Sequence, residues 1–166
     1  MDELLLVRHA IAAERDPFAP ADDPARPLTD EGAARFARAA RGLGRLVPEV
    51  GLVLASPYAR AWQTAEILER EAGWPAPEPC AALEAIRSAD DALAALAACR
   101  EATVAAVGHE PQLSELASLL LAGDEHAVHV QLRKGGAVLL SCPGGPRRGA
   151  AVLCWSATPK LLRAAS

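Results

Sequence analysis

The hydrophobic positions of this 166-residue chain follow two different patterns along its length. Three short runs are apolar at almost every position, namely residues 3–9 (ELLLVRH), 51–56 (GLVLAS) and 103–109 (TVAAVGH). A strand that is apolar at consecutive positions is buried on both faces, which is typical of a parallel sheet covered by helices on each side. We therefore predict that these three runs are strands of such a sheet.

The segments between these runs show helical periodicity. Residues 30–47 place Phe36 and Leu43 on one face, and Thr29 can cap the helix that they predict. A second helix is predicted to begin at Ser56, as its cap, and to end at Ala72 before a glycine. A third helix is expected at roughly 88–100 and a fourth from Pro111. The tail predicts two strands, 136–142 and 150–156, joined by a hairpin turn.

The order of these elements, β-α-β-α-β-α-β-β, predicts an α/β fold with a mostly parallel central sheet and helices on both faces. We see no internal repeat and no linker, so residues 1–166 are expected to form a single three-layer domain. The segment 16–27 (DPFAPADDPARP) predicts a long surface loop near one end of the sheet. It is either a simple connector or the rim of a site.

Composition narrows the class of protein further. Hydrophobic residues make up 51% of the chain and aromatics only 4%, so the core is expected to consist mainly of Ala, Leu and Val. A net charge of −4 argues against broad nucleic-acid binding. The apolar runs are too short for a signal sequence or a membrane span, so we expect a cytoplasmic protein. The four cysteines are widely spaced, and we expect them to be small buried residues.

Charged and polar side chains follow each of the three apolar runs. The first run ends on Arg8 and His9, the second leads to Arg60 in the following helix, and the third ends on His109. Ligands of open α/β sheets bind beyond the carboxyl ends of the strands. Two arginines and two histidines, far apart in sequence, are thus expected to meet at one edge of the sheet and form an anion site.

The anion that best fits this set is a phosphoryl group. Arginine presents a planar pair of N–H donors that matches phosphate oxygens and keeps its charge. A neutral histidine among arginines can also attack phosphorus, while the arginines neutralise the charge of the transition state. The residues therefore predict either a catalytic or a purely binding phosphate site.

Four motifs in this order resemble the histidine phosphatase superfamily, which has the phosphoglycerate mutase-like fold. They are LVRHA (6–10), RPLTDEG (26–32), SPYARAWQTA (56–65) and VGHEP (107–111). The short chain and the RPLT segment are most similar to the SixA-type phosphohistidine phosphatases. The usual motif has glycine after the first histidine, and this chain has Ala10 instead.

The resemblance implies a role for each matching residue. His9 would be the nucleophile that becomes phosphohistidine, and Arg8, Arg60 and His109 would bind the phosphoryl group and stabilise its transfer. No metal or other cofactor would be needed. Arg26 would brace its loop.

The general acid is less well defined by the motifs. Larger relatives supply a carboxylate that protonates the leaving group, and Glu84, in the segment ALEAI, stands at a comparable place. Glu110, beside His109, is the rival, although its negative charge also suits the start of the following helix. A phosphohistidine is a good leaving group, so acid assistance would matter less for that substrate.

We therefore expect a phosphatase that removes a phosphoryl group from a protein histidine through a covalent intermediate on His9. The partner would be a phosphocarrier or a histidine phosphotransfer domain, and neither nucleic acid nor a membrane is expected to bind. Two alternatives remain, namely a phosphatase of broad specificity for small phosphoesters and a non-catalytic phosphate- or phosphoprotein-binding module. His126 and His129 form an H-x-x-H pair that is predicted to lie in a strand or loop rather than to bind a metal.

Overall fold

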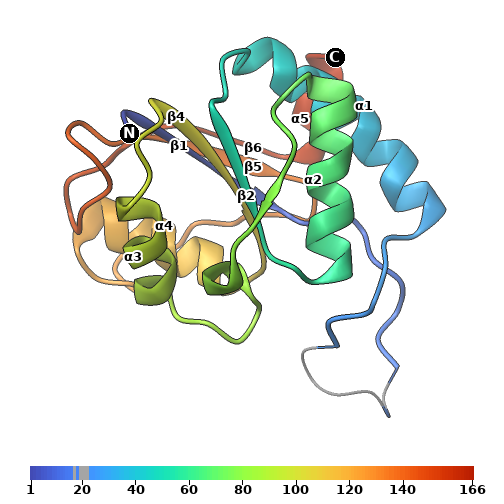
Figure 1. Cartoon of the computed structure of the whole chain (residues 1–166), viewed down its shortest axis with the longest axis horizontal. Coiled ribbons are helices and arrows are strands. Elements are labelled where there is room, and N and C mark those ends of the chain that lie inside the picture. The colour runs from blue at the N-terminus through green and yellow to red at the C-terminus, as the bar shows by residue number, and fades with distance from the viewer. Residues whose placement is uncertain (17, 19–22) are drawn as a thin grey trace.

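In the computed structural model, which describes residues 1–16, 18 and 23–166, six strands form one sheet in the order β3-β2-β4-β1-β5-β6. Helices α1, α2 and α5 cover one face of this sheet, and α3 and α4 cover the other (Figure 1). The elements are β1 (Glu3–Arg8), α1 (Asp30–Leu46), β2 (Leu52–Ala55), α2 (Ala59–Ala72), β3 (Glu78–Pro79), a short 3₁₀ helix η1 (Ala81–Leu83), α3 (Ala89–Ala97), β4 (Thr103–Gly108), α4 (Gln112–Ala122), β5 (Ala137–Ser141), β6 (Val152–Ala157) and α5 (Pro159–Ala164).

The centre of the sheet is parallel, as predicted. Strand β4 lies between β1 and β2 and runs parallel to both, with Arg8 of β1 opposite Gly108 at its end. Strand β5 pairs antiparallel with β1 and with β6, so the tail forms the predicted antiparallel pair. Because β1, β2 and β4 point the same way, their carboxyl ends meet at one edge of the sheet.

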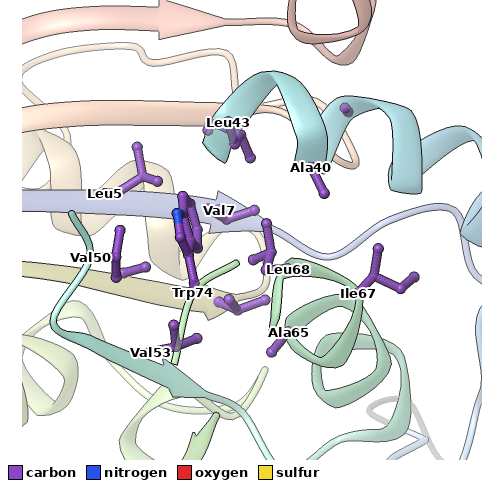
Figure 2. Packing of buried hydrophobic residues seen from close by; sticks show 14 of the residues in the cluster. Leu5, Val7, Ala40, Leu43, Val50, Val53, Ala65, Ile67, Leu68 and Trp74 are labelled. Atoms are coloured by element: carbon purple, nitrogen blue, oxygen red, sulfur yellow. The ribbon is translucent and has the colours of Figure 1, made fainter. Parts of the chain in front are cut away.

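Alternate residues of each central strand enter two separate cores, which explains the unbroken apolar runs. Leu5 and Val7 face the layer of α1, α2 and α5, whereas Leu4 and Leu6 face the layer of α3 and α4. Figure 2 shows side chains of the first core gathered between these strands and helices α1 and α2. Its labelled residues are Leu5, Val7, Ala40, Leu43, Val50, Val53, Ala65, Ile67, Leu68 and Trp74.

Helix boundaries follow local capping where the sequence pattern was clear. The side chain of Thr29 accepts a hydrogen bond from the backbone N–H of Gly32 and caps α1, as predicted. The prediction that Ser56 caps α2 is wrong, because that helix begins at Ala59 after Tyr58. Ser56 is instead fully buried, and its hydroxyl contacts His109. The Ser56 hydroxyl still accepts a local hydrogen bond from the backbone N–H of Tyr58, and the contact with His109 is made in addition to it.

The predictions for the remaining features are confirmed in part. Cys142 is buried as expected, but Cys154 is exposed because β6 lies at the edge of the sheet with much of its side-chain surface uncovered.

His126 and His129 lie in an irregular segment and are exposed. Helix α5 was not predicted. None of the described helices has the length and apolar character that a membrane span requires.

Candidate functional site

A cavity of about 560 Å³ lies at the carboxyl edge of β1 and β4, and we call it the His9 cavity. The four residues that the strand ends were predicted to bring together, Arg8, His9, Arg60 and His109, all line it. They come from β1, from the loops that follow β1 and β4, and from the first turn of α2. The other lining residues are Arg15, Arg26, Ala85, Ile86, Glu110 and Lys134.

His9 is held in one orientation by hydrogen bonds of the backbone around it. Its own N–H donates to the carbonyl of Gly108, and the N–H of Ala10 donates to the hydroxyl of Thr64. The ring nitrogen Nδ1 lies 2.7 Å from the carbonyl oxygen of Ala10. Because a carbonyl oxygen can only accept, Nδ1 carries the proton in this hydrogen bond. The neutral ring therefore has its unprotonated nitrogen, with its lone pair, at Nε2.

Arg8 is fixed at the wall of the cavity by the loop before β5. Its Nη1 donates to the carbonyl of Leu132 at 2.9 Å. The backbone N–H of Gly135 donates to the carbonyls of both Arg8 and His9, at 3.0 and 3.1 Å. Gly135 has a φ of +74°, a left-handed conformation that glycine adopts without strain. This loop thus positions the two residues on which the first strand ends.

Arg60 is almost fully buried although it lies in the first turn of α2. Its Nη1 donates to the carbonyl of Asp23 at 2.9 Å, and its guanidinium carbon lies 5.3 Å from the centre of the Tyr58 ring. A guanidinium held in this way loses little further freedom when an anion binds. Its permanent charge lies on the same cavity wall as His9.

His109 packs against His9 and is tied to the end of β2. The centres of the two imidazole rings are 5.3 Å apart, and Nε2 of His109 lies 2.9 Å from the hydroxyl oxygen of Ser56. Its Nδ1 is buried with no hydrogen-bond partner among the described residues. When the Ser56 hydroxyl donates to Nε2, Nδ1 carries the proton of the neutral ring.

Both histidines are kept neutral by their surroundings. Burial is the main cause that lowers the pKa of His9 from 6.5 to about 3, and it outweighs the opposing effect of the hydrogen bond to Ala10. Burial likewise lowers the pKa of His109 to about 2, with the charge of Arg60 as the next cause. A neutral imidazole is the form that an attack on phosphorus requires, and His9 is in that form at neutral pH.

The two candidate carboxylates lie in different places. Glu110 lines the His9 cavity, is half-buried, and accepts hydrogen bonds from the hydroxyl and backbone N–H of Ser114. Burial raises the pKa of this carboxyl, against the hydrogen bonds of Ser114 and the charge of Arg8. Glu84 is not part of the cavity lining, and its carboxylate lies 3.8 Å from the guanidinium of Arg87. The structure thus brings Glu110 to the four predicted residues and leaves Glu84 outside their cavity.

Three further cations on the cavity wall were not predicted as site residues. Arg15 directly precedes the predicted surface loop 16–27 and Arg26 lies within it, and residues 17 and 19–22 of this loop lie outside the described part of the chain. Arg26 also braces this loop as expected, through a hydrogen bond from Nη1 to the carbonyl of Ala13. Lys134 lies in the loop that holds Arg8. Little in the sequence indicates that these three cations line a site, because cations in loops are usually solvated.

Metal-binding side chains are not clustered in the described part of the chain, where no group of three or more His, Cys, Asp or Glu residues could hold an ion. The cavity itself presents several cations beside a neutral imidazole, which is the arrangement of an anion site.

Comparisons with known proteins agree with this geometry. Residues 4–87 match the model of the histidine phosphatase superfamily, branch 1. An uncharacterized protein of Picosynechococcus sp. is 37% identical over 152 residues, which cover 90% of this chain and 87% of that protein.

Solved structures share the fold over almost the whole chain. The protein histidine phosphatase SixA complexed with tungstate is similar with a TM-score of 0.81 and 24% identity, covering 96% of this chain and 99% of that chain. A protein assigned as SixA from Nakamurella multipartitia has a TM-score of 0.73 and 26% identity, covering 95% of this chain and 96% of that chain. A mycobacterial glucosyl-3-phosphoglycerate phosphatase has a TM-score of 0.69 and 16% identity, covering 95% of this chain and 99% of that chain. From its family match and its 37% identical relative, the chain belongs to the histidine phosphatase superfamily, and it is a phosphatase.

Proposed function

We propose that this chain is a phosphohistidine phosphatase that acts on a histidine of another protein, with His9 as its nucleophile. The observation that carries the proposal is the hydrogen bond from Nδ1 of His9 to the carbonyl of Ala10. It leaves the lone pair on Nε2, in a cavity that Arg8 and Arg60 also line. A site that only bound phosphate would not require a histidine fixed in its nucleophilic tautomer.

The reaction takes place in two displacements. Nε2 of His9 forms a bond to phosphorus while the bond from phosphorus to the substrate imidazole nitrogen breaks, and the released imidazole takes up a proton. Arg8 and Arg60 neutralise the charge on the phosphoryl oxygens, and His109 donates a hydrogen bond from Nδ1. Water then attacks the phosphorus of phospho-His9, which releases inorganic phosphate and restores the neutral imidazole.

Two features support a protein as the substrate. The segment between Arg60 and His109 holds no long insertion, and Ile86, on the cavity wall, is 68% exposed. An exposed apolar side chain at the mouth of a site can contact a second protein. The fold shared with a SixA that is described as a protein histidine phosphatase agrees with this choice.

A phosphatase for small phosphoesters is the second candidate, and one observation favours it. The cavity volume of about 560 Å³ exceeds the space that one phosphoryl group needs, and three cations line it beyond Arg8 and Arg60. A small substrate with a second anionic group would use that space and charge.

The test is to offer a phosphorylated histidine protein and small phosphoesters to the same preparation and compare kcat/KM. We expect a clear preference for the protein-borne phosphohistidine. A strong preference for the small esters would contradict the proposal and favour the second candidate. Free phosphohistidine serves as the matched control, because it carries the same leaving group without the protein around it.

A further inference from the structure

Two other depressions, along α1 and α5, lie beside the His9 cavity. Lys134 lines the His9 cavity and also a neighbouring pocket of about 40 Å³, to which Arg35 and Arg163 belong. Arg35 and Arg163 in turn line a depression of about 420 Å³ together with Arg38. Because each depression shares lining residues with the next, the three lie side by side, leading from the His9 cavity outward.

This surface is rich in positive charge. We call Lys134, Arg35, Arg163 and Arg38 the basic track. Arg35 forms an exposed ion pair with Glu31 at 3.1 Å, an arrangement that contributes little free energy. In the described part of the chain, no carboxylate forms an ion pair with Lys134, Arg163 or Arg38.

The track stands out against the charge of the whole protein. The chain has a net charge of −4, so these cations are a local excess on an acidic molecule. Local fields of this kind steer oppositely charged partners and raise their association rates. Arg38 and Arg163 do not line the His9 cavity, so a small phosphate bound there is outside their direct reach.

We propose that the basic track docks an acidic surface of the phosphorylated partner protein and so presents its phosphohistidine to His9. This inference rests on the proposed function and adds the chemical character of the partner, namely carboxylates placed to one side of the phosphorylated histidine. The apolar side chain of Ile11, which is 39% exposed, lines the pocket between the cavity and the outer arginines. It adds an apolar contact to the track.

The test reverses charge at the outer end of the track, away from the reacting atoms. We compare wild type with Arg38→Glu and with the double variant Arg38→Glu/Arg163→Glu. The substrates are an acidic histidine phosphotransfer domain phosphorylated with phosphoramidate, the same domain with the carboxylates around its histidine changed to amides, and free phosphohistidine. At low salt we expect the double variant to lower kcat/KM for the acidic domain by about tenfold, mainly through KM.

Activity on free phosphohistidine should stay unchanged in both variants. Arg100→Glu is the matched control for the single variant and Arg100→Glu/Arg147→Glu for the double variant, because Arg100 precedes β4 and Arg147 follows β5, at the opposite edge of the sheet. They change the net charge equally and should keep wild-type activity on the acidic domain. If Arg163→Glu frays α5, the salt dependence of the wild type still decides the matter. Its kcat/KM for the acidic domain should fall with salt, and that for the amide variant should not.

The outcomes separate this proposal from the function on which it rests. If the wild type acts on free phosphohistidine but on neither domain, the protein-substrate function fails, and the docking proposal fails with it. If the wild type acts on both domains equally, or the double variant matches the wild type at low salt, the function stands and the basic track has no docking role.

Discussion

The floor and the rim of the His9 cavity are built in different ways. The floor consists of Arg8, His9, Arg60 and His109, which parallel strands and one helix start bring to a single edge. Both histidines and Arg60 are buried there, each with an orienting hydrogen bond. The rim, by contrast, consists of loop residues, of which Lys134 and Ile86 are exposed.

This difference suits the floor and the rim to two different functions, namely catalysis and the selection of substrate. Side chains at the floor are mostly buried and are held by hydrogen bonds, so they suit chemistry that needs fixed positions. Side chains at the rim can change without disturbing the sheet, so they suit the choice of substrate. We therefore expect floor substitutions to affect all substrates alike and rim substitutions to affect some substrates more than others.

The largest effect should come from the nucleophile. His9→Ala is expected to lower kcat for every substrate by on the order of 10⁴-fold or more, because the covalent route is lost. Steady-state kinetics on a phosphohistidine protein and on a small ester would measure this. Phosphate binding should persist in part, since Arg8 and Arg60 remain. If His9→Ala kept wild-type turnover, the covalent mechanism would be wrong.

Substitution of the arginines of the floor should have the second largest effect on activity. Arg8→Ala and Arg60→Ala are each expected to lower kcat/KM by about 10²–10³-fold, as for the loss of a transition-state donor, and to weaken phosphate binding as well. Arg8→Lys and Arg60→Lys keep the charge but lose the paired donors, and they should recover only part of the rate. Arg15→Ala, on the rim, is the control. An equal loss in Arg15→Ala would remove the distinction between floor and rim.

Substitution of Glu110 or Glu84 should lower kcat by an amount that depends on the substrate. Glu110→Gln is expected to lower kcat for an alcohol phosphoester by roughly tenfold or more and to have a smaller effect on a phosphohistidine substrate, which needs less acid assistance. Glu84→Gln is the matched comparison, and we expect it to cost less, since Glu84 does not line the cavity. A greater loss in Glu84→Gln would instead support the acid that the family resemblance implies. The measurement is kcat for both variants on both substrates.

The smallest effect should appear in stability at low pH. In the unfolded chain His9 takes up a proton near its ordinary pKa of 6.5, but in the folded protein it does so only near 3. Between these values the unfolded state binds more protons, so this residue makes stability fall as the pH falls from 6.5 toward 3. Urea unfolding at neutral pH and near pH 5 should show a smaller decrease for His9→Asn than for wild type. Equal decreases would mean that His9 is not held neutral by burial.

The sequence predicted the floor better than the rim for a physical reason. Unbroken apolar runs identify buried parallel strands, and the residue that follows such a strand has a defined place at the sheet edge. Arg8 and His109 could be placed in this way. Lys134 could not, because its position depends on a loop whose course is fixed by the hydrogen bonds of Gly135 to β1 and His9.

Ser56 and Glu110 show a second limit of the sequence. Both stand beside helix starts, where capping is the usual role, and Glu110 does bind the backbone N–H of Ser114 in the first turn of α4. The contact of Ser56 with His109 depends instead on strands that are distant in sequence. Local patterns predict local hydrogen bonds, and they carry no information on which distant side chain competes for the same group.

The central claim is that Nε2 of His9 accepts the phosphoryl group. The most direct measurement is intact mass after brief mixing with a phosphohistidine donor, quenched at alkaline pH, for wild type and His9→Ala. We predict one added phosphoryl group on the wild type and none on the variant. An adduct of equal amount on His9→Ala would contradict the account, and so would consumption of the donor by that variant at the wild-type rate.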